Sequence, residues 1–414
     1  MAMIAKFLQR RAVVASAQRT HVAQSISTNI SARSCVIAAR TAVRGESRTF
    51  VQSPFRNIQH QMLHASRCMS TTTGSAKQID VWEAVRVMKS PNVTPEERIE
   101  AITTVKVDAV EKLEKEQQTL EVIESGAVET LVEFLKDADS TEASELLVPA
   151  FLSLIRLSTQ PLIAQELIRL DAASLMTHFL SLPDPRLQAA ACLMLGHIAL
   201  EPASEQAVSD PNVIDKVLKV LSSPHEAIQR AGATCLANIA GNRLAREKLC
   251  ETEAIFTLSE LVSDEHSDAM RSAAAFALGN LLSGRDIGAQ DMLRENGGLA
   301  ELVMLLSPAF SEEVSSSAAW AIQHGVHLNH QSQSLVAEAG GLNLLVQHLS
   351  AATIQLQTNA LLALASTIEA HVQNKAWCRV NGVVELLQQV EADDGDDMSE
   401  EAKRALHTIV QELA

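Results

Sequence analysis

The chain has 414 residues and a formal net charge of −16, and its charge is divided unevenly. Residues 1–74 contain nine arginines, one lysine and a single acid, Glu46, so they carry +9, whereas the other 340 residues carry −25. The acidic part has no tyrosine and no apolar run near the roughly 20 residues that a membrane-spanning helix needs, which excludes a transmembrane segment. Its charge and its few aromatic residues also argue against nucleic-acid binding.

The basic segment begins with the pattern of an amphipathic helix. Within residues 1–11, Ile4, Phe7 and Leu8 share one helical face and the basic residues share another. Serine and threonine are frequent from there to residue 73, and the apolar core of a secretory signal is missing. An alternative is a disordered basic arm that binds nucleic acid or lipid, but such arms use lysine as freely as arginine.

This leader resembles a mitochondrial presequence, and two short stretches resemble matrix-protease sites. One ends before Ser70, and the other lies around residues 48–53. The resemblance implies a disordered transit peptide at residues 1–69, cleaved near Ser70 or earlier, and a linker at residues 70–79. It also implies a mitochondrial location, with the matrix side favoured over the intermembrane space.

The composition after the leader favours helices, because alanine, leucine, glutamate and glutamine abound and β-branched runs are scarce. A helical N-terminal cap is expected at residues 80–124. Within it, Thr94 and Glu97 have the spacing of a capping box, with Pro95 at the first helical position.

Two sequence landmarks recur with the same period through the acidic part. The first is a nine-residue apolar window, and its copies are separated by 45, 41, 41, 44, 43 and 41 residues. These copies begin at Ala127, Ala172, Val213, Ala254, Gly298, Gly341 and Gly382. The second landmark, a short motif typified by Leu236-Ala-Asn-Ile239, recurs between them at steps of 41 to 44 residues. Each unit therefore predicts a helix, a loop and a longer helix.

Glycine or asparagine introduces most of the first windows, as at Gly297 and Gly340, where a helix end needs a left-handed backbone. The longer helix is apolar on more than one stripe, as in residues 189–199, so it must be covered on more than one side. Stacking between neighbouring repeats supplies that cover.

The recurring pattern G-G-L-x-x-L-V-x-L-L … A-A-x-A-L-x-N-L resembles armadillo repeats over about residues 120–390. HEAT repeats are the near alternative. The resemblance implies an all-α fold, a right-handed α-solenoid of about six to seven armadillo-like repeats with a period of about 42 residues. We expect the array at residues 125–390, an acidic loop at residues 391–398 and a C-terminal capping helix at residues 399–414.

One polar position per repeat interrupts the second landmark. The resemblance to armadillo repeats implies that this position lines a concave groove, where asparagine holds an extended peptide and an aromatic residue four positions earlier offers an apolar plate. The partner-binding residues expected on this basis are Arg156, His197, Asn238, Phe276, Asn280, Trp320, His324 and Ser366. The alternative is that these polar groups satisfy neighbouring helix ends across adjacent repeats.

No motif supports catalysis, a metal or a cofactor. His324, His327 and His330 are spaced by three, which predicts one side of a helix, yet no acid or cysteine lies among them as a further ligand. A solvated helix end is the default there, and no metal is expected. Cys192 and Cys235 fall on the long helices of adjacent repeats and are expected to be small core residues.

These observations predict a non-enzymatic mitochondrial scaffold that binds protein and needs no cofactor or small-molecule substrate. The favoured form is an accessory subunit or assembly partner of a large complex, such as the ATP synthase, a respiratory complex or the mitochondrial ribosome. It is expected to be soluble or peripherally attached to the inner membrane. A free peptide-binding adaptor, a cytosolic catenin-like or vacuolar scaffold, and a helical enzyme using the groove or residues 324–330 are the alternatives.

Overall fold

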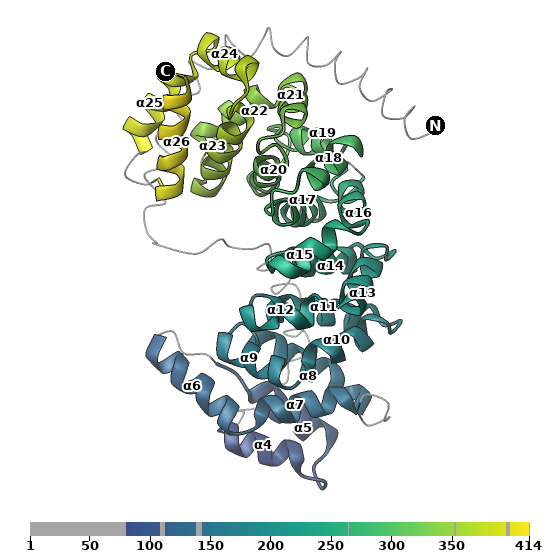
Figure 1. Ribbon diagram of the computed structural model, residues 1–414. Coiled ribbons are helices and arrows are strands. Elements are labelled where there is room, and N and C mark those ends of the chain that lie inside the picture. Colours follow the sequence, from purple (N-terminus) through teal and green to yellow (C-terminus); the bar gives the residue numbers. More distant parts are fainter. Residues whose placement is uncertain are drawn as a thin grey trace. The chain divides into compact units, whose positions relative to one another are not determined.

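The computed structural model describes residues 80–107, 112–137, 143–263, 265–351, 353–394 and 398–413. The expected transit peptide, its cleavage site near Ser70 and the linker at residues 70–79 lie outside these ranges. Within them, the regular elements are all helices, as the composition predicts, and no strand occurs. The helices are arranged as a stack of repeats that can be followed along the chain in Figure 1.

Each repeat contains three helices, one more than the two that the sequence predicts. The additional helix opens the repeat and forms what we call the first-helix row. This row consists of α6 (Lys112–Glu124), α9 (Pro161–Arg169), α12 (Glu205–Val208), α15 (Arg243–Cys250), α18 (Ile287–Glu295), α21 (His330–Glu338) and α24 (Val372–Val380). These helices are mostly short and bury few apolar side chains, so their sequence periodicity is weak. In α15, for example, Ala245 and Leu249 are the buried residues.

The predicted apolar windows form the second-helix row, and the longer helices form the third-helix row. The second row consists of α7 (Ala127–Lys136), α10 (Ala172–Leu180), α13 (Pro211–Leu221), α16 (Ala254–Leu261), α19 (Gly298–Met304), α22 (Gly341–Gln347) and α25 (Val383–Asp394). The third row consists of α8 (Ala143–Leu157), α11 (Pro185–Ala199), α14 (Glu226–Ile239), α17 (Asp268–Leu282), α20 (Glu312–Gly325), α23 (Ile354–Ile368) and α26 (Glu400–Leu413). A short 3₁₀ turn at Pro202–Ser204 leads directly into α12, and another at His348–Ser350 follows α22 within the sixth repeat.

Two helices precede the first repeat and cap the stack. They are α4 (Val81–Lys89), which packs on α7, and α5 (Pro95–Thr104), which packs on α8. The predicted capping box is confirmed, since Thr94 Oγ1 accepts from the Glu97 amide at 3.3 Å and Glu97 Oε2 accepts from the Thr94 amide at 3.0 Å. The predicted cap boundary at residue 124 needs correction, because α6 packs on α7 and α9 and belongs to the first repeat.

The C-terminal end also differs from the expected boundaries. The acidic loop expected at residues 391–398 is shorter, because α25 continues as a helix to Asp394. Helix α26 packs on α23 and α25, so it is the third helix of the seventh repeat rather than an appended cap. Its outer surface carries exposed Glu400, Arg404 and His407, which gives the end of the stack the polar surface that a soluble array needs.

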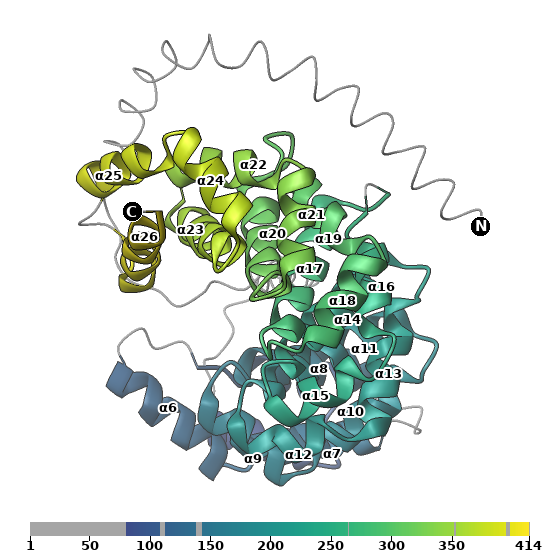
Figure 2. The same cartoon turned by 45° about the horizontal axis from the view of Figure 1, so that its top comes forward.

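The third-helix row is continuous from one end of the stack to the other. Each of its members contacts the next member, from α8 through α26, and α5 of the cap packs on α8. Figure 2 shows α17, α20 and α23 side by side. Helix α11 is buried on nearly every side, with 12 buried residues between Leu187 and Ala199, as its several apolar stripes predict. These helices approach closely because small residues separate them. Ser272 of α17 and Ser317 of α20, for example, lie 3.0 Å apart, Oγ to Oγ.

Glycines provide the tight turns into the second-helix row, as predicted. Gly297 and Gly340 both have φ of +82°, a backbone conformation that side chains with a Cβ rarely adopt. In the second repeat, Asp171 takes the same conformation at φ +56° without a glycine. The packing of the repeat therefore determines the turn, and glycine lowers the conformational energy that the turn costs.

The contact between α17 and α20 is tight enough to test. A Cβ added at Gly279 would lie 2.1 Å from Cδ1 of Trp320, so the indole would have to move. We expect Gly279→Ala to lower the free energy of unfolding by about 1–3 kcal/mol, measured by urea denaturation. In a Trp320→Ala background the same change should be neutral or stabilising, because alanine favours the helix once the indole is gone. An equal cost in both backgrounds would contradict this account.

Candidate protein-binding face

The residues predicted to bind a partner lie on successive helices of the third-helix row. Arg156 is on α8, His197 on α11, Asn238 on α14, Phe276 and Asn280 on α17, Trp320 and His324 on α20, and Ser366 on α23. The one-per-repeat polar positions all fall within the last turn of their helices. They therefore share a register, and we call the surface that they mark the third-helix face.

The two asparagines of this register bind the preceding repeat. Asn238 Nδ2 donates to the Gly196 carbonyl at 3.0 Å, and Asn280 Nδ2 donates to the Ala237 carbonyl at 2.9 Å. Both acceptors belong to the last turn of a helix, where carbonyls have no partner within the helix. These amide groups thus fulfil the alternative that the sequence left open, because they satisfy a neighbouring helix end.

His197 is also part of the interior. Its side chain is 5% exposed, and Nδ1 lies 2.7 Å from Oγ of Ser158, which follows α8. Burial lowers the pKa of His197 to about 4, so the imidazole is neutral at pH 7. His197 therefore joins the first and second repeats and offers little surface to a partner.

The aromatic residues of the face are more accessible, and contacts within the protein hold Trp320 and His324 in place. Half-buried Trp320 donates through Nε1 to Asn280 Oδ1 at 3.0 Å, so both ends of that amide are used within the protein. The ring of His324 meets the indole edge to face, with centroids 4.4 Å apart. Phe276 lies half-buried one turn before Asn280 on α17. Fixed aromatic rings of this kind provide contact area at a low entropic cost.

Arg156 and Ser366 lie at the two ends of the register. Arg156 Nη2 lies 3.4 Å from the Thr103 carbonyl of α5 and 3.4 Å from Ser153 Oγ, both long for hydrogen bonds. Ser366 is half-buried, and its backbone carbonyl accepts from Gln333 Nε2 at 2.8 Å. Arg156 and Ser366 therefore flank the central residues of the register.

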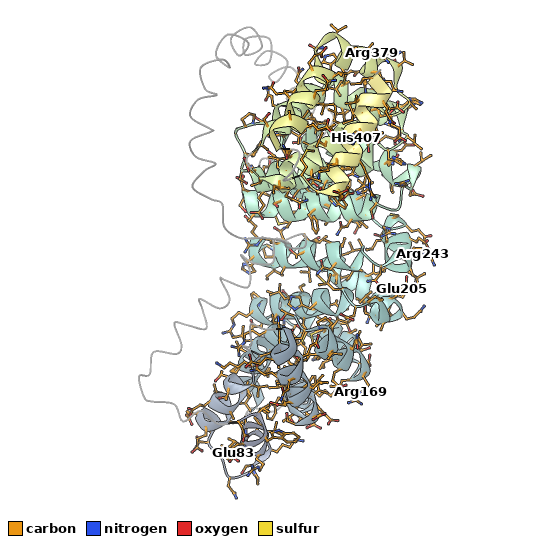
Figure 3. All side chains as sticks on the ribbon, turned by 90° about the vertical axis from the view of Figure 1, so that its left-hand side faces the viewer. Glu83, Arg169, Glu205, Arg243, Arg379 and His407 are labelled. Carbon is orange, nitrogen blue, oxygen red and sulfur yellow. The ribbon has the colours of Figure 1, made fainter. Side chains whose placement is uncertain are left out.

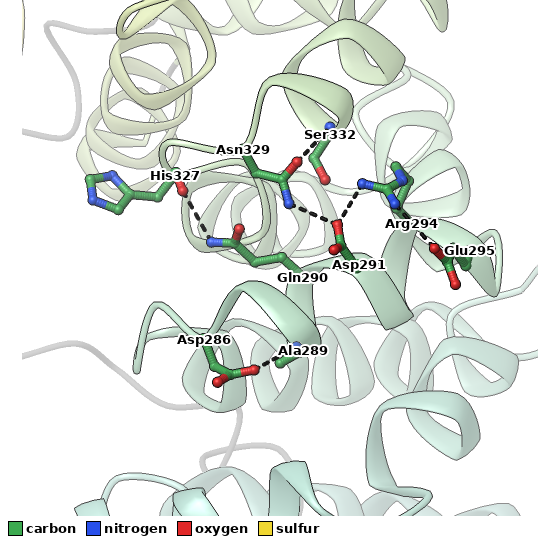
Figure 4. Close-up of polar contacts among 9 residues, drawn as sticks. All are labelled: Asp286, Ala289, Gln290, Asp291, Arg294, Glu295, His327, Asn329 and Ser332. Atoms are coloured by element: carbon green, nitrogen blue, oxygen red, sulfur yellow. Dashed lines mark hydrogen bonds and ion pairs between the residues drawn. The ribbon is translucent and has the colours of Figure 1, made fainter.

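Sequence reasoning missed a second set of coupling residues, which lies on the first-helix row. Gln290 Nε2 donates to the carbonyls of His324 at 2.9 Å and His327 at 3.2 Å, and Figure 4 shows the second of these bonds. Gln333 repeats the arrangement one unit later, with the carbonyls of Ser366 and Glu369. The signal was available, since the two glutamines are 43 residues apart in phase with the repeats. It lay in a helix that the sequence did not predict.

A charged clamp beside Gln290 joins the fifth repeat to the start of the sixth (Figure 4). Asp291 accepts from Asn329 Nδ2 at 3.0 Å and pairs with Arg294 at 2.6 Å. The hydrogen bond from Asn329, followed by the contact with Arg294, lowers the pKa of Asp291. Asn329 also caps α21 by accepting from the Ser332 amide at 3.2 Å. The clamp therefore fixes the start of α21 against α18.

The first-helix row carries charges of both signs along one side of the stack. Figure 3 shows Arg169, Glu205, Arg243 and Arg379 along that side. Glu205 Oε1 accepts from the Leu244 amide at 3.1 Å and caps α15, while Arg243 forms an exposed pair within its own helix. Exposed pairs contribute about 0–1 kcal/mol each. This side is thus mixed polar surface without a concentration of one charge.

The three histidines do not form the helical row that their spacing predicts. His324 ends α20, His327 lies in the following turn and His330 begins α21, because the chain reverses between them. His327 Nδ1 lies 3.2 Å from Glu369 Oε2. Within the described ranges, no three histidine, cysteine or acidic side chains are grouped as a metal site.

The cysteines of adjacent third-row helices are core residues, as predicted. Cys192 is fully buried and Cys235 is 1% exposed. Burial raises the pKa of the Cys192 thiol to about 12, and it raises that of Cys235 well above its usual range. Both thiols are therefore protonated at neutral pH and are poor nucleophiles.

Comparisons with known proteins agree with this architecture. A family model for HEAT repeats matches residues 172–279. An engineered protein of known structure is 24% identical, with a TM-score of 0.66 over 80% of this chain and 78% of that chain. A designed armadillo repeat protein is 27% identical, with a TM-score of 0.52 over 58% and 98%. Another, in complex with the peptide (KR)4, is 27% identical, with a TM-score of 0.51 over 57% and 99%. A search of the curated proteins finds no match.

The described chain is an α-solenoid of the armadillo/HEAT type. Solenoids of this type generally act as scaffolds for protein interaction and are not enzymes. None of the helices in the described ranges is both long and apolar enough to cross a lipid bilayer.

Burial of His197 makes stability depend on pH. Since its pKa is about 4 in the folded protein and about 6.5 when unfolded, the unfolded chain binds more protons between these values. Neutral, buried His197 therefore costs no unfolding free energy above pH 6.5, and the unfolding free energy falls as the pH drops from 6.5 towards 4. We expect His197→Asn to remove roughly 2 kcal/mol of the fall in unfolding free energy between pH 7 and pH 5.

The matched control for this prediction is His407→Asn, since the His407 side chain is 63% exposed. Urea denaturation at both pH values measures the difference for each variant against the unchanged protein. If His197→Asn and His407→Asn alter the pH dependence equally, burial of His197 is not its cause.

Proposed function

We propose that the protein is a non-enzymatic scaffold that binds a protein partner on the third-helix face. The observation that carries the proposal is the continuous third-helix row, in which each member from α8 to α26 packs on the next member. Such a row offers a long, rigid surface built on well-packed helices, and rigid surfaces lose little entropy when they bind. The half-buried Phe276 and Trp320 on α17 and α20 provide apolar contact area near its middle.

The similar designed protein in complex with the peptide (KR)4 supports a partner-binding role for a solenoid of this type. The hydrogen bonds of the asparagines nevertheless favour a different mode of binding in this chain. Asn238 is 6% exposed and already donates to Gly196, and Asn280 is engaged at both its nitrogen and its oxygen. A partner that covers side chains over several repeats fits these facts better than a peptide whose main chain is held by an asparagine ladder.

We further propose that the partner is a large mitochondrial complex, of which this protein is an accessory subunit or an assembly partner. The support for the location comes from the leader, whose nine arginines and single acid within residues 1–74 are typical of a presequence. A complex subunit is expected to bury the second-helix row as well as the third, whereas a free adaptor uses the third-helix face alone.

The native size of the endogenous protein tests membership in a complex. Gently solubilised mitochondria are separated on a native gel, and co-migrating proteins are identified by mass spectrometry. We expect the protein to migrate within one large assembly. Migration near the mass of the mature chain would favour the free adaptor. Absence of the protein from mitochondria would contradict the proposed mitochondrial location.

Two phenylalanines of the fourth repeat distinguish the faces. Phe276 lies half-buried on α17 of the third row, and Phe256, 39% exposed, lies on α16 of the second row. We expect Phe276→Ala to weaken capture of the co-migrating partner by about tenfold, as the loss of an apolar anchor does. Thermal denaturation of both variants checks that the fold is retained.

The response of the matched variant, Phe256→Ala, then identifies the type of scaffold. A similar loss indicates a subunit that is covered on both rows, whereas full binding indicates an adaptor that uses the third-helix face. If Phe276→Ala captures the partner as well as the unchanged protein does, the third-helix face is not the binding surface.

A further inference from the structure

The turns that lead from the third-helix row into the first-helix row carry half of the exposed large apolar side chains in the described ranges. Each of these side chains follows the end of a third-row helix by no more than five residues, and they are Leu162, Leu200, Ile287, Leu328 and Val372. The turn after α14 has exposed Arg243 instead. The uninterrupted part of the series therefore consists of Ile287, Leu328 and Val372, which we call the apolar edge.

Hydrogen bonds to α18 fix the backbone on both sides of Leu328. The carbonyl of His327 accepts from Gln290 Nε2 at 3.2 Å, and Nδ2 of Asn329 donates to Asp291 at 3.0 Å. The Leu328 side chain is 54% exposed between these two anchored neighbours. It is therefore presented to solvent by a rigid support, which lowers the entropy that a binding partner would have to overcome.

Equivalent contacts place the other two residues on the same line. Ile287 lies one turn before Asp291 on the same face of α18, and this face meets the turn that contains Leu328. One repeat later, His371 Nε2 lies 3.0 Å from Ser334 Oγ of α21, and Val372 follows directly. The apolar edge thus runs across three neighbouring turns that are bonded to one another.

The backbone of Leu328 adopts a conformation that favours glycine. The turns after α17, α20 and α23 each place a non-glycine residue in the left-handed region, two positions before the next helix begins: Arg285 at φ +60°, Leu328 at +52° and Ala370 at +55°. A leucine in this region costs conformational energy. Because more than half of the Leu328 side chain is exposed, packing in the core does not require it. Strain that is retained for an exposed side chain indicates a function for that side chain.

The spacing of the apolar edge fits a helix. Packed helices lie about 8–10 Å apart, so side chains at equivalent turns of neighbouring repeats recur at about that distance. An α-helix presents residues seven positions apart on one face, at intervals of about 10.5 Å. An extended segment presents same-face side chains every ~6.7 Å and does not keep this register. An amphipathic helix that lies along the stack therefore matches the edge.

The apolar edge borders the third-helix face. His324 lies four residues before Leu328, and Ser366 lies six residues before Val372. Each pair is joined by the last turn of a third-row helix and the loop that follows it. A partner on the third-helix face can therefore reach the edge without leaving the surface of the stack.

Charge favours a partner helix with a basic polar side. Residues 251–414 contain seven bases and 23 acids, which gives 7 − 23 = −16. At the edge itself, exposed Arg285 and Asp286 offset each other, so the attraction is of long range. Complementary charge of this kind increases the rate of association and disfavours acidic partners.

We propose that the apolar edge binds one amphipathic helix of the partner, with apolar residues seven positions apart on one face and basic residues on the other. Ile287, Leu328 and Val372 each contact apolar residues of one heptad. The inference rests on the proposed scaffold function, and it specifies the kind of segment that is bound beside the third-helix face.

A synthetic peptide of three Leu-Ala-Lys-Leu-Ala-Lys-Gln heptads is the probe, because its binding does not require the partner. Full-length protein with ¹³C-labelled isoleucine δ1-methyl groups is titrated with the peptide, and the methyl resonances are followed by NMR. We expect a saturable shift of Ile287. Ile354 is the internal control, since it is 54% exposed at the opposite edge, at the start of α23, and should not shift.

A second peptide of the same composition, with its leucines at every second position, tests the shape of the occupant. We expect it to shift Ile287 much less than the heptad peptide does. Stronger binding of this second peptide would assign the edge to an extended segment, and self-association through Leu328 would assign it to a second copy of the chain. Either result, or equal shifts of Ile287 and Ile354, would overturn the proposal.

The strained leucine allows stability and binding to be separated. Leu328→Gly relieves the backbone, so we expect it to unfold at the same or a higher urea concentration and yet to bind the heptad peptide about tenfold more weakly. Arg285→Gly is the matched control, because it relieves the equivalent position of the neighbouring turn and removes no apolar side chain. It should not weaken binding. Unchanged binding by Leu328→Gly would show that the edge is not the site.

The outcomes also separate this inference from the proposed function. If the heptad peptide does not bind but Phe276→Ala weakens partner capture, the third-helix face stands and the apolar edge does not. If the peptide binds as expected but Phe276→Ala leaves partner capture intact, the edge stands and the third-helix face loses its role.

Discussion

The structure depends on the close side-by-side packing of the third-row helices. Each of these helices from α11 to α23 is covered by its own repeat on one side and by neighbouring repeats on two others, so its interior positions accept only residues that the spacing allows. The clearest case is Gly279, where even a methyl group would meet Trp320. Packing of this density fixes the axial position of each repeat, which then determines where the polar residues of the face are held.

Polar bonds between repeats follow from the same geometry. Once the helices are in register, a side chain in one repeat reaches the same carbonyl of the previous one, and the bonds recur at the repeat spacing. Asn238 with Gly196, Asn280 with Ala237 and Asn359 with Ser316 are separated by 42, 43 and 43 residues. The bonds of Asn238 and Asn280 satisfy helix ends that would otherwise be buried without partners, whereas Asn359 binds a carbonyl in the first half of α20. All three bonds make the stability of each repeat depend on its neighbour.

The features that repeat strongly could be predicted from the sequence. The prediction failed where a helix was too short to show a period, and where one residue type could serve either binding or packing. The apolar windows became the second-helix row because each buries a full stripe, and the one-per-repeat polar position was found because it interrupts an apolar helix. The first-helix row was missed because helices such as α12, four residues long, bury too little to impose a period. Spacing alone could not distinguish whether Asn238 binds a partner or a neighbouring helix, since both uses require the same amide at the same place.

Because one amide can serve either a partner or a neighbouring helix, the repeats along the third-helix face differ in what they can offer a partner. An amide that already satisfies a helix end cannot also bind a partner with the same donor, so the repeats with complete polar coupling have little hydrogen-bonding capacity left. His197, Asn238 and Asn280, in the second to fourth repeats, are largely used internally. Among the described residues, buried acceptors without donors occur from Gln290 onwards, but these atoms have almost no exposed surface. A partner that covers the whole face would therefore gain mainly apolar contact, near α17 and α20, where Phe276 and Trp320 are half-buried.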